Sequence, residues 1–171
     1  MQDKIKSITG RIEQLEKKFT ELTRELRTIL WEDDQVSARI LHADMDYIEK
    51  QLVTASFVNC TPHTIAIEGI GDLPPSGILP RVTHSFEDCL PLNGVRVRQK
   101  LGAGYVMGLP DPVEGLTFIV SGMVRDALSH SDALSALPEF QSRPDVYAPD
   151  TGPDAIRNEK GHIVAVLGLV Q

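Results

Sequence analysis

The first fifty residues carry a regular pattern of apolar and polar positions. Apolar side chains recur at alternating spacings of three and four residues, with charged residues of both signs between them. The stripe consists of Ile5, Ile8, Ile12, Leu15, Phe19, Leu22, Leu26 and Ile29. Such a heptad pattern predicts a helix that packs its apolar stripe against a partner. At 1.5 Å per residue, the stripe is about 37 Å long.

Asp33 interrupts the stripe and leaves two helical structures open. In one, a long parallel coiled coil tolerates Asp33. Beyond Asp33, in either structure, the stripe resumes at Val36, Ile40, Ala43 and Tyr47. In the other, residues 31–34 form the corner of a helical hairpin, and Asp33 or Asp34 caps a second helix that runs to about Leu52. We expect the helices to assemble the chain into a homo-oligomer, and the mixture of Ile, Leu and Phe along the stripe favours more than two chains.

Beyond residue 50 the pattern changes to short apolar runs between chain breakers. All 11 prolines and 12 of the 13 glycines lie there. The expected strands are 57–59, 64–68, 78–84, 95–99, 116–120 and 163–169, with a helix over 122–128 and a hairpin tip at 157–162. Six to eight such strands predict a small, mainly antiparallel sandwich or barrel. The expected fold class is therefore α+β, with a helical coiled coil at 1–52 followed by a β-rich domain at 56–171.

Charge and composition narrow the class of function. The 171-residue chain has a net charge of −7 and is 42% hydrophobic, which is enough for a packed core. The acidic charge disfavours direct binding to nucleic acid or to an anionic membrane. No run of about 18 apolar residues is present to span a bilayer. Two cysteines and an N-terminus without an apolar signal core favour a reducing, cytoplasmic setting.

Two motifs resemble catalytic ones without their usual context. Asp150-Thr151-Gly152 matches the aspartic-protease triplet, but prolines flank it on both sides. A turn in which Asp150 caps local amides is the expected alternative. The glycines at 102, 104 and 108 lack the spacing of a phosphate loop, and the prolines at 110 and 112 prevent the helix that should follow.

A zinc site is a further alternative, because two Cys and two His side chains occur within thirty residues. The set is Cys60, His63, His84 and Cys89. Thiolates and imidazoles are good zinc ligands. The competing interpretation is a buried Cys60 and a His63 that hydrogen-bonds to backbone. We expect no metal and no cofactor.

Polar and cationic residues instead indicate binding of an anion. Only eight cationic side chains occur beyond residue 50, and Arg96 and Arg98 are spaced to share one strand face. Arginine presents a planar fork to phosphate or carboxylate, although a solvated strand face is the simpler alternative. The expected ligand-binding residues are Asn59, Thr61, His63, Ser76, Arg81, Arg96, Arg98 and Arg157.

An ordered set of motifs over about 57–171 resembles a group of small proteins encoded by phages, prophages and actinobacteria. The motifs are Asn59-Cys60-Thr61-Pro62-His63, Pro74-Pro75-Ser76-Gly77, Arg81-Val82, Pro149-Asp150-Thr151-Gly152-Pro153 and Arg157-Asn158-Glu159-Lys160-Gly161. Cys60 stands where the group usually has Leu, and Asn158 where it usually has Asp. The resemblance implies a viral or mobile-element setting rather than a reaction.

These observations together favour binding over catalysis. We expect a phage-type accessory protein of the host cytoplasm that sequesters a small anionic ligand, such as a nucleotide signal, as an oligomer. An anti-defence role fits this setting. The alternative is a structural or protein-interaction module, such as a virion component or scaffold, with a coiled-coil stalk and a β head.

Overall fold

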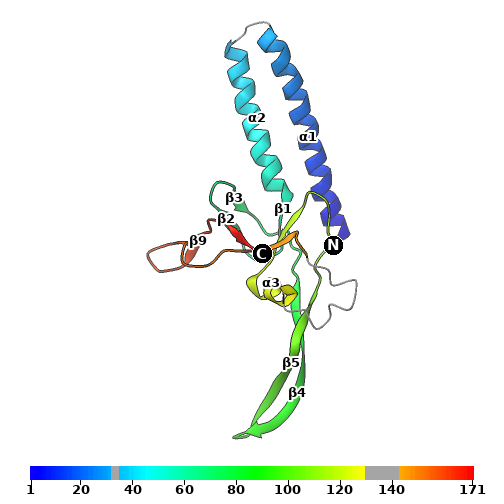
Figure 1. Cartoon of the computed structure of the whole chain (residues 1–171), viewed down its shortest axis with the longest axis vertical. Helices are drawn as coiled ribbons and strands as arrows, with labels where there is room; N and C mark the ends of the chain where they lie inside the picture. The colour runs from blue at the N-terminus through cyan, green and yellow to red at the C-terminus, as the bar shows by residue number, and fades with distance from the viewer. Residues whose placement is uncertain (32–34, 130–142) are drawn as a thin grey trace.

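The chain forms a helical hairpin, a β-rich head and a long two-stranded arm (Figure 1). This computed structural model describes residues 1–31, 35–129 and 143–171. Helices α1 (Gln2–Trp31) and α2 (Gln35–Ser56) lie side by side on one side of the head. The arm, made of β4 (Arg81–Leu92) and β5 (Val95–Met107), projects from the opposite side. The expected α+β class is confirmed.

The helical hairpin, rather than a continuous coiled coil, is the structure that the chain adopts. The α1 stripe from Ile5 to Ile29 is buried or half-buried, and α2 packs against α1. One chain therefore covers most of its own stripe, so the stripe alone does not require an oligomer. Near the head, the Arg11 guanidinium donates a hydrogen bond of 3.1 Å to the Gln51 side-chain oxygen and links the two helices.

The expected continuation of the stripe into α2 is wrong. Ile40 and Tyr47 are 61% and 63% exposed, whereas Ile48 is only 3% exposed. The inward face of α2 consists of Leu41, Met45, Ile48 and Leu52. The chain reverses direction between the two helices. The positions of α2 that face α1 therefore need not continue the heptad pattern of α1.

The head is built on a four-stranded mixed sheet in the order β1-β6-β7-β10. Its strands are β1 (Phe57–Asn59), β6 (Thr117–Ile119), β7 (Val146–Pro149) and β10 (Leu169–Val170). β1, β6 and β7 are parallel, and β10 is antiparallel to β7. Phe118 and Ile119 have no exposed surface, as expected for a central strand covered on both faces.

Three further strand pairs, each antiparallel, surround this sheet. They are the arm, β2 (Ile65–Ile67) with β3 (Gly71–Leu73), and β8 (Ile156–Arg157) with β9 (Ile163–Ala165). Helix α3 (Gly122–Ser129) confirms the helix expected over 122–128. The strand expected at 163–169 is split into β9 and β10, and the described strands close into neither a sandwich nor a barrel.

The start of α1 forms part of the head. Ile5, Ile8 and Ile12 pack against a buried cluster that includes Val58 and Phe118. The helical region and the β region therefore share a core, and α2 passes into β1 without a linker because it ends at Ser56 and β1 begins at Phe57. Within the described ranges, no helix is long and apolar enough to cross a membrane.

Candidate functional site

Asn59 organises the turn that follows β1. It is 2% exposed, and its amide nitrogen donates hydrogen bonds to the carbonyl oxygens of His63 (2.7 Å) and Leu73 (2.8 Å). Its side-chain oxygen accepts a bond of 2.9 Å from the Thr61 amide and lies 2.7 Å from the Thr61 hydroxyl. A buried amide that is satisfied in this way shapes the backbone around it. Asn59 therefore holds this turn in place through the protein's own backbone groups.

Ser76 has a similar supporting role. Its hydroxyl and its backbone amide both donate to the Asn59 carbonyl oxygen, at 2.7 and 2.8 Å. The hydroxyl oxygen also accepts a bond of 3.2 Å from the amide of Ile78. Gly77 has a φ of 74°, a left-handed conformation that glycine adopts without strain. The Pro-Pro-Ser-Gly segment is thus tied to the end of β1.

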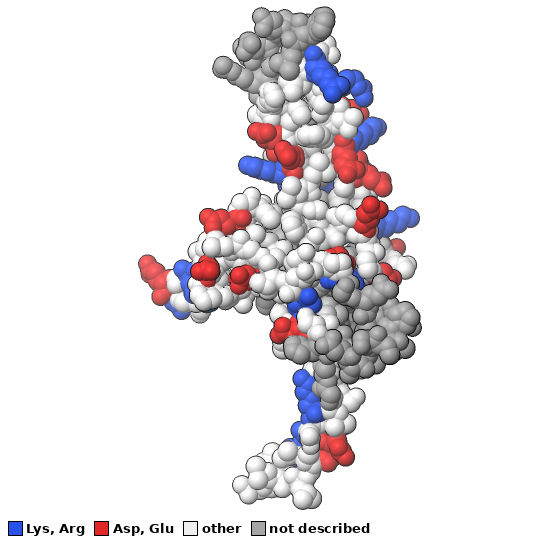
Figure 2. All heavy atoms as spheres, viewed as in Figure 1, with Lys and Arg blue, Asp and Glu red and all other residues white. Residues whose placement is uncertain are grey.

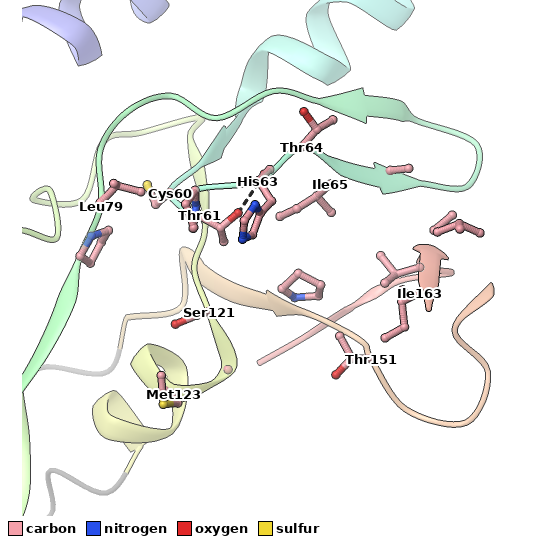
Figure 3. A pocket seen from close by; sticks show the side chains of 18 of the residues that line it. Cys60, Thr61, His63, Thr64, Ile65, Leu79, Ser121, Met123, Thr151 and Ile163 are labelled. Carbon is pink, nitrogen blue, oxygen red and sulfur yellow. Dashed lines mark hydrogen bonds between the residues drawn. The ribbon is translucent and has the colours of Figure 1, made fainter. Parts of the chain in front are cut away.

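A pocket of about 580 Å³ opens beside this turn (Figure 3). Its walls come from the turn after β1, from β2, from the start of β4, from the start of α3, and from the β7–β9 region. In the close view, the side chains of Thr61 and His63 lie next to each other in the wall, between Cys60 and Ile65. The apolar part of the wall includes Ile65, Leu79, Pro80, Met123, Pro149, Ile163 and Val164. The volume lies within the range of small-molecule sites.

The charge of the pocket differs from the charge of the chain. The described residues that line it include Arg81 and His63 but no Asp or Glu, in a protein with a net charge of −7. Arg81 makes no ion pair with any carboxylate in the described ranges. Ser121 and Gly122, at the start of α3, also line the wall, so the positive end of that helix lies at the pocket. The pocket is therefore suited to an anion.

The only thiol in the pocket wall is unsuited to nucleophilic chemistry. Cys60 is 3% exposed, and burial raises its pKa to about 11, although a hydrogen bond with Ser76 and the charge of Arg143 act in the opposite direction. The thiol is accordingly protonated at neutral pH, whereas the thiolate is the reactive form.

Asp150-Thr151-Gly152 forms the turn that was expected of it. The Asp150 carboxylate accepts a hydrogen bond of 3.0 Å from the Gly152 amide. The Arg157 guanidinium donates to the carbonyl oxygens of Thr151 (3.1 Å) and Gly161 (3.2 Å) and so joins this turn to the β8–β9 hairpin. Because Thr151 lines the pocket, Arg157 holds one of its walls in place.

Arg96 and Arg98 lie on the arm, away from the pocket. The strand pairs place Arg81 opposite Met107 and Asp88 opposite Arg98, so about 23 Å of strand separates Arg81 from this pair. Arg96 makes a two-pronged ion pair with Asp88, with hydrogen bonds of 3.0 and 2.8 Å. The Arg98 guanidinium stacks 4.9 Å from the centre of the Phe86 ring. The eight predicted ligand-binding residues therefore do not form one site within a single chain.

The four candidate zinc ligands are also dispersed. Cys60 and His63 lie in the turn after β1, whereas His84 and Cys89 lie along β4 of the arm. His84 lies in an irregular part of the β4–β5 ladder near Gly104, with its ring steeply inclined to that of Phe86 at a centroid distance of 6.3 Å. Among the residues that the structure describes, no group of three or more Cys, His, Asp or Glu side chains is arranged to hold a metal.

Sequence reasoning identified Thr61, His63 and Arg81 but missed the apolar wall of the pocket. Leu79, Met123 and Ile163 belong to segments that are far apart in the chain, and each has the local sequence of an ordinary strand or helix start. No family model, curated protein or solved structure matches the chain. The site therefore rests on its geometry and chemistry.

Proposed function

We propose that the head binds a small anionic molecule, most simply a nucleotide, in the pocket beside Arg81. The observation that carries the proposal is the charge of the lining: one Arg, one His and no carboxylate, in a chain with 24 Asp and Glu residues. A surface drawn at random from this protein would contain acidic groups, which would repel a phosphate at close range.

The remaining wall suits the uncharged part of such a ligand. The aliphatic and proline side chains offer flat apolar surface to a base or another planar group, and Thr61, His63 and Thr151 offer hydrogen-bonding groups. A phosphate would lie against the Arg81 guanidinium, where the start of α3 adds main-chain donors. Binding then depends on close donors, because the net charge of −7 gives no long-range attraction for an anion.

The state of two potentially reactive groups favours retention of the ligand over its conversion. The pocket thiol is protonated, and the carboxylate of Asp150 is engaged with the amide of Gly152. Combined with the resemblance to phage-encoded proteins, this supports a sequestering role, for example removal of a nucleotide signal in the host cytoplasm.

Calorimetry on two matched arginine variants tests the proposal. The wild type is screened against mono-, di- and cyclic nucleotides, and the ligand that binds is then titrated into Arg81→Ala and Arg98→Ala. Loss of one charge-assisted contact costs about 1.5–3 kcal/mol, so Arg81→Ala is expected to bind roughly 10- to 150-fold more weakly. Arg98→Ala removes the same charge from the arm and is expected to bind like the wild type. Equal weakening by both variants, or no nucleotide bound, would contradict the proposal.

The second candidate function is that of a structural or protein-interaction module, such as a virion component or scaffold. The helical hairpin and the arm favour it, because both project from the head and present exposed surface (Figure 2). Recovery of the chain from purified virions would support this function, and its absence from them would favour the sequestering one.

A further inference from the structure

The β4–β5 arm exposes apolar side chains at its tip. Leu90, Leu92 and Val95 are 90%, 68% and 66% exposed. The tip turns through Asn93 and Gly94, whose positive φ values of 51° and 83° are those of a tight hairpin turn. From Ser85 to Leu101, nearly every described side chain is exposed, and Cys89 and Val97 are half-buried. Figure 2 shows the tip as a surface without charged groups.

A free arm of this kind is physically unfavourable. A two-stranded hairpin alone is at best marginally stable in water, and exposed apolar side chains at a rigid tip raise that cost. A partner that covers the tip would remove this apolar surface from water.

The charge of the arm identifies the kind of partner. Residues 81–107 contain four cationic side chains and two carboxylates, a net charge of +2. The rest of the chain contains 13 cationic side chains and 22 carboxylates, a net charge of −9. Arg96, Arg98 and Lys100 alternate along β5, and only Arg96 is paired with a carboxylate in the described ranges. The arm and the rest of the chain therefore carry net charges of opposite sign, so a surface outside the arm can attract the arm of another copy.

The outer face of α2 is the surface that fits. Ile40 and Tyr47 form an exposed apolar stripe there, and the exposed charged residues of α2 between Ile40 and Val53 are Asp44, Asp46, Glu49 and Lys50, a net charge of −2. From Ile40 to Lys50 this face is about 15 Å long, and the arm beyond Ser85 is about 26 Å long. The arm and the helices project from opposite sides of the head (Figure 1). A two-fold axis perpendicular to the long axis would place each arm beside the partner's α2.

We propose that a second copy of this chain is the partner, with the arm of each copy docked on the outer face of α2 of the other. The two contacts are then equivalent, as in other two-fold dimers. The apolar tip and Tyr47 become covered, and the unpaired cations of β5 approach Asp44 and Asp46. This assembly uses neither the α1 stripe nor the pocket, so it stands apart from the proposed function.

Sedimentation velocity of the full chain between 1 and 100 µM tests the dimer. The wild type is expected to sediment with twice its mass of 18.8 kDa. Leu90→Glu combined with Leu92→Glu, and Tyr47→Glu alone, are each expected to give monomers with unchanged circular dichroism. Leu167→Glu changes a 53%-exposed apolar residue outside both surfaces and is expected to remain dimeric. A monomeric wild type, or dimers that survive the arm and α2 substitutions, would overturn the proposal.

Mixing the two defective variants tests which surfaces meet. A chain with a defective arm and a chain with Tyr47→Glu still share one intact arm–helix contact, so the mixture is expected to recover part of the dimer. Contact between two arms would give no such recovery and would overturn the assignment. A monomeric wild type that retards labelled duplex DNA, and loses this effect in Arg98→Glu, would also overturn it and assign the arm to nucleic acid.

Discussion

Asn59 illustrates how a polar residue in an apolar segment is read from sequence. Its position between Val58 and Cys60 identifies it as a polar residue that needs partners, and the sequence suggested that a ligand supplies them. In the structure, the partners are backbone groups of Thr61, His63 and Leu73. Sequence therefore locates the residue, but its partners are fixed by the β2–β3 hairpin, whose position depends on tertiary packing.

Replacing Asn59 with Ala is expected to destabilise the head strongly. The substitution leaves buried carbonyl and amide groups without partners, at a cost of about 1–3 kcal/mol each. We expect a loss of about 2–4 kcal/mol in the free energy of unfolding, measured by equilibrium urea denaturation.

Asn158→Ala is the matched control for this prediction. The Asn158 side chain also accepts two backbone hydrogen bonds, from Lys160 and His162, but the residue is exposed. Its loss is expected to cost less than about 1 kcal/mol, because water replaces the bonds. Similar costs for the two variants would show that Asn59 is not the buried support described above.

At the scale of elements, periodicity predicts the long helices and the local breakers predict the turns. The α1 stripe and the tip around Asn158 follow their sequence patterns. The length of the arm was not expected, although the Asn93-Gly94 pair between two alternating segments is the sequence signal of a tight hairpin. Strands of two to four residues, such as β8 and β10, are set by their pairing partners, which local sequence does not specify.

Adjacent substitutions on α2 test the hairpin. Ile48→Glu places a charge at a site that is 3% exposed and is expected to lower the melting temperature sharply, with loss of helical circular dichroism. Tyr47→Glu introduces the same charge at an exposed site and is expected to retain the helical signal of the wild type. Equal losses from the two substitutions would indicate that α2 is buried on both faces and contradict the hairpin geometry.

At the scale of the whole molecule, charge is distributed unevenly in a way that composition conceals. The net charge of −7 does not reveal a pocket without carboxylates or a cationic arm. Both features arise because the fold brings together residues such as Thr61, Arg81, Met123 and Ile163 from separate segments. A single sequence carries no signal for that convergence.

Methyl NMR of isoleucine-labelled protein during nucleotide titration tests the central claim, that the pocket binds an anionic small molecule. Ile65 and Ile163 line the pocket, whereas Ile12 and Ile48 lie in the helical hairpin. Saturable shifts of the Ile65 and Ile163 methyl signals are expected, and in Arg81→Ala they are expected to need roughly 10- to 150-fold more nucleotide, while Ile12 and Ile48 stay unchanged. Saturable shifts confined to the helices, or no shifts with any mono-, di- or cyclic nucleotide, would contradict it.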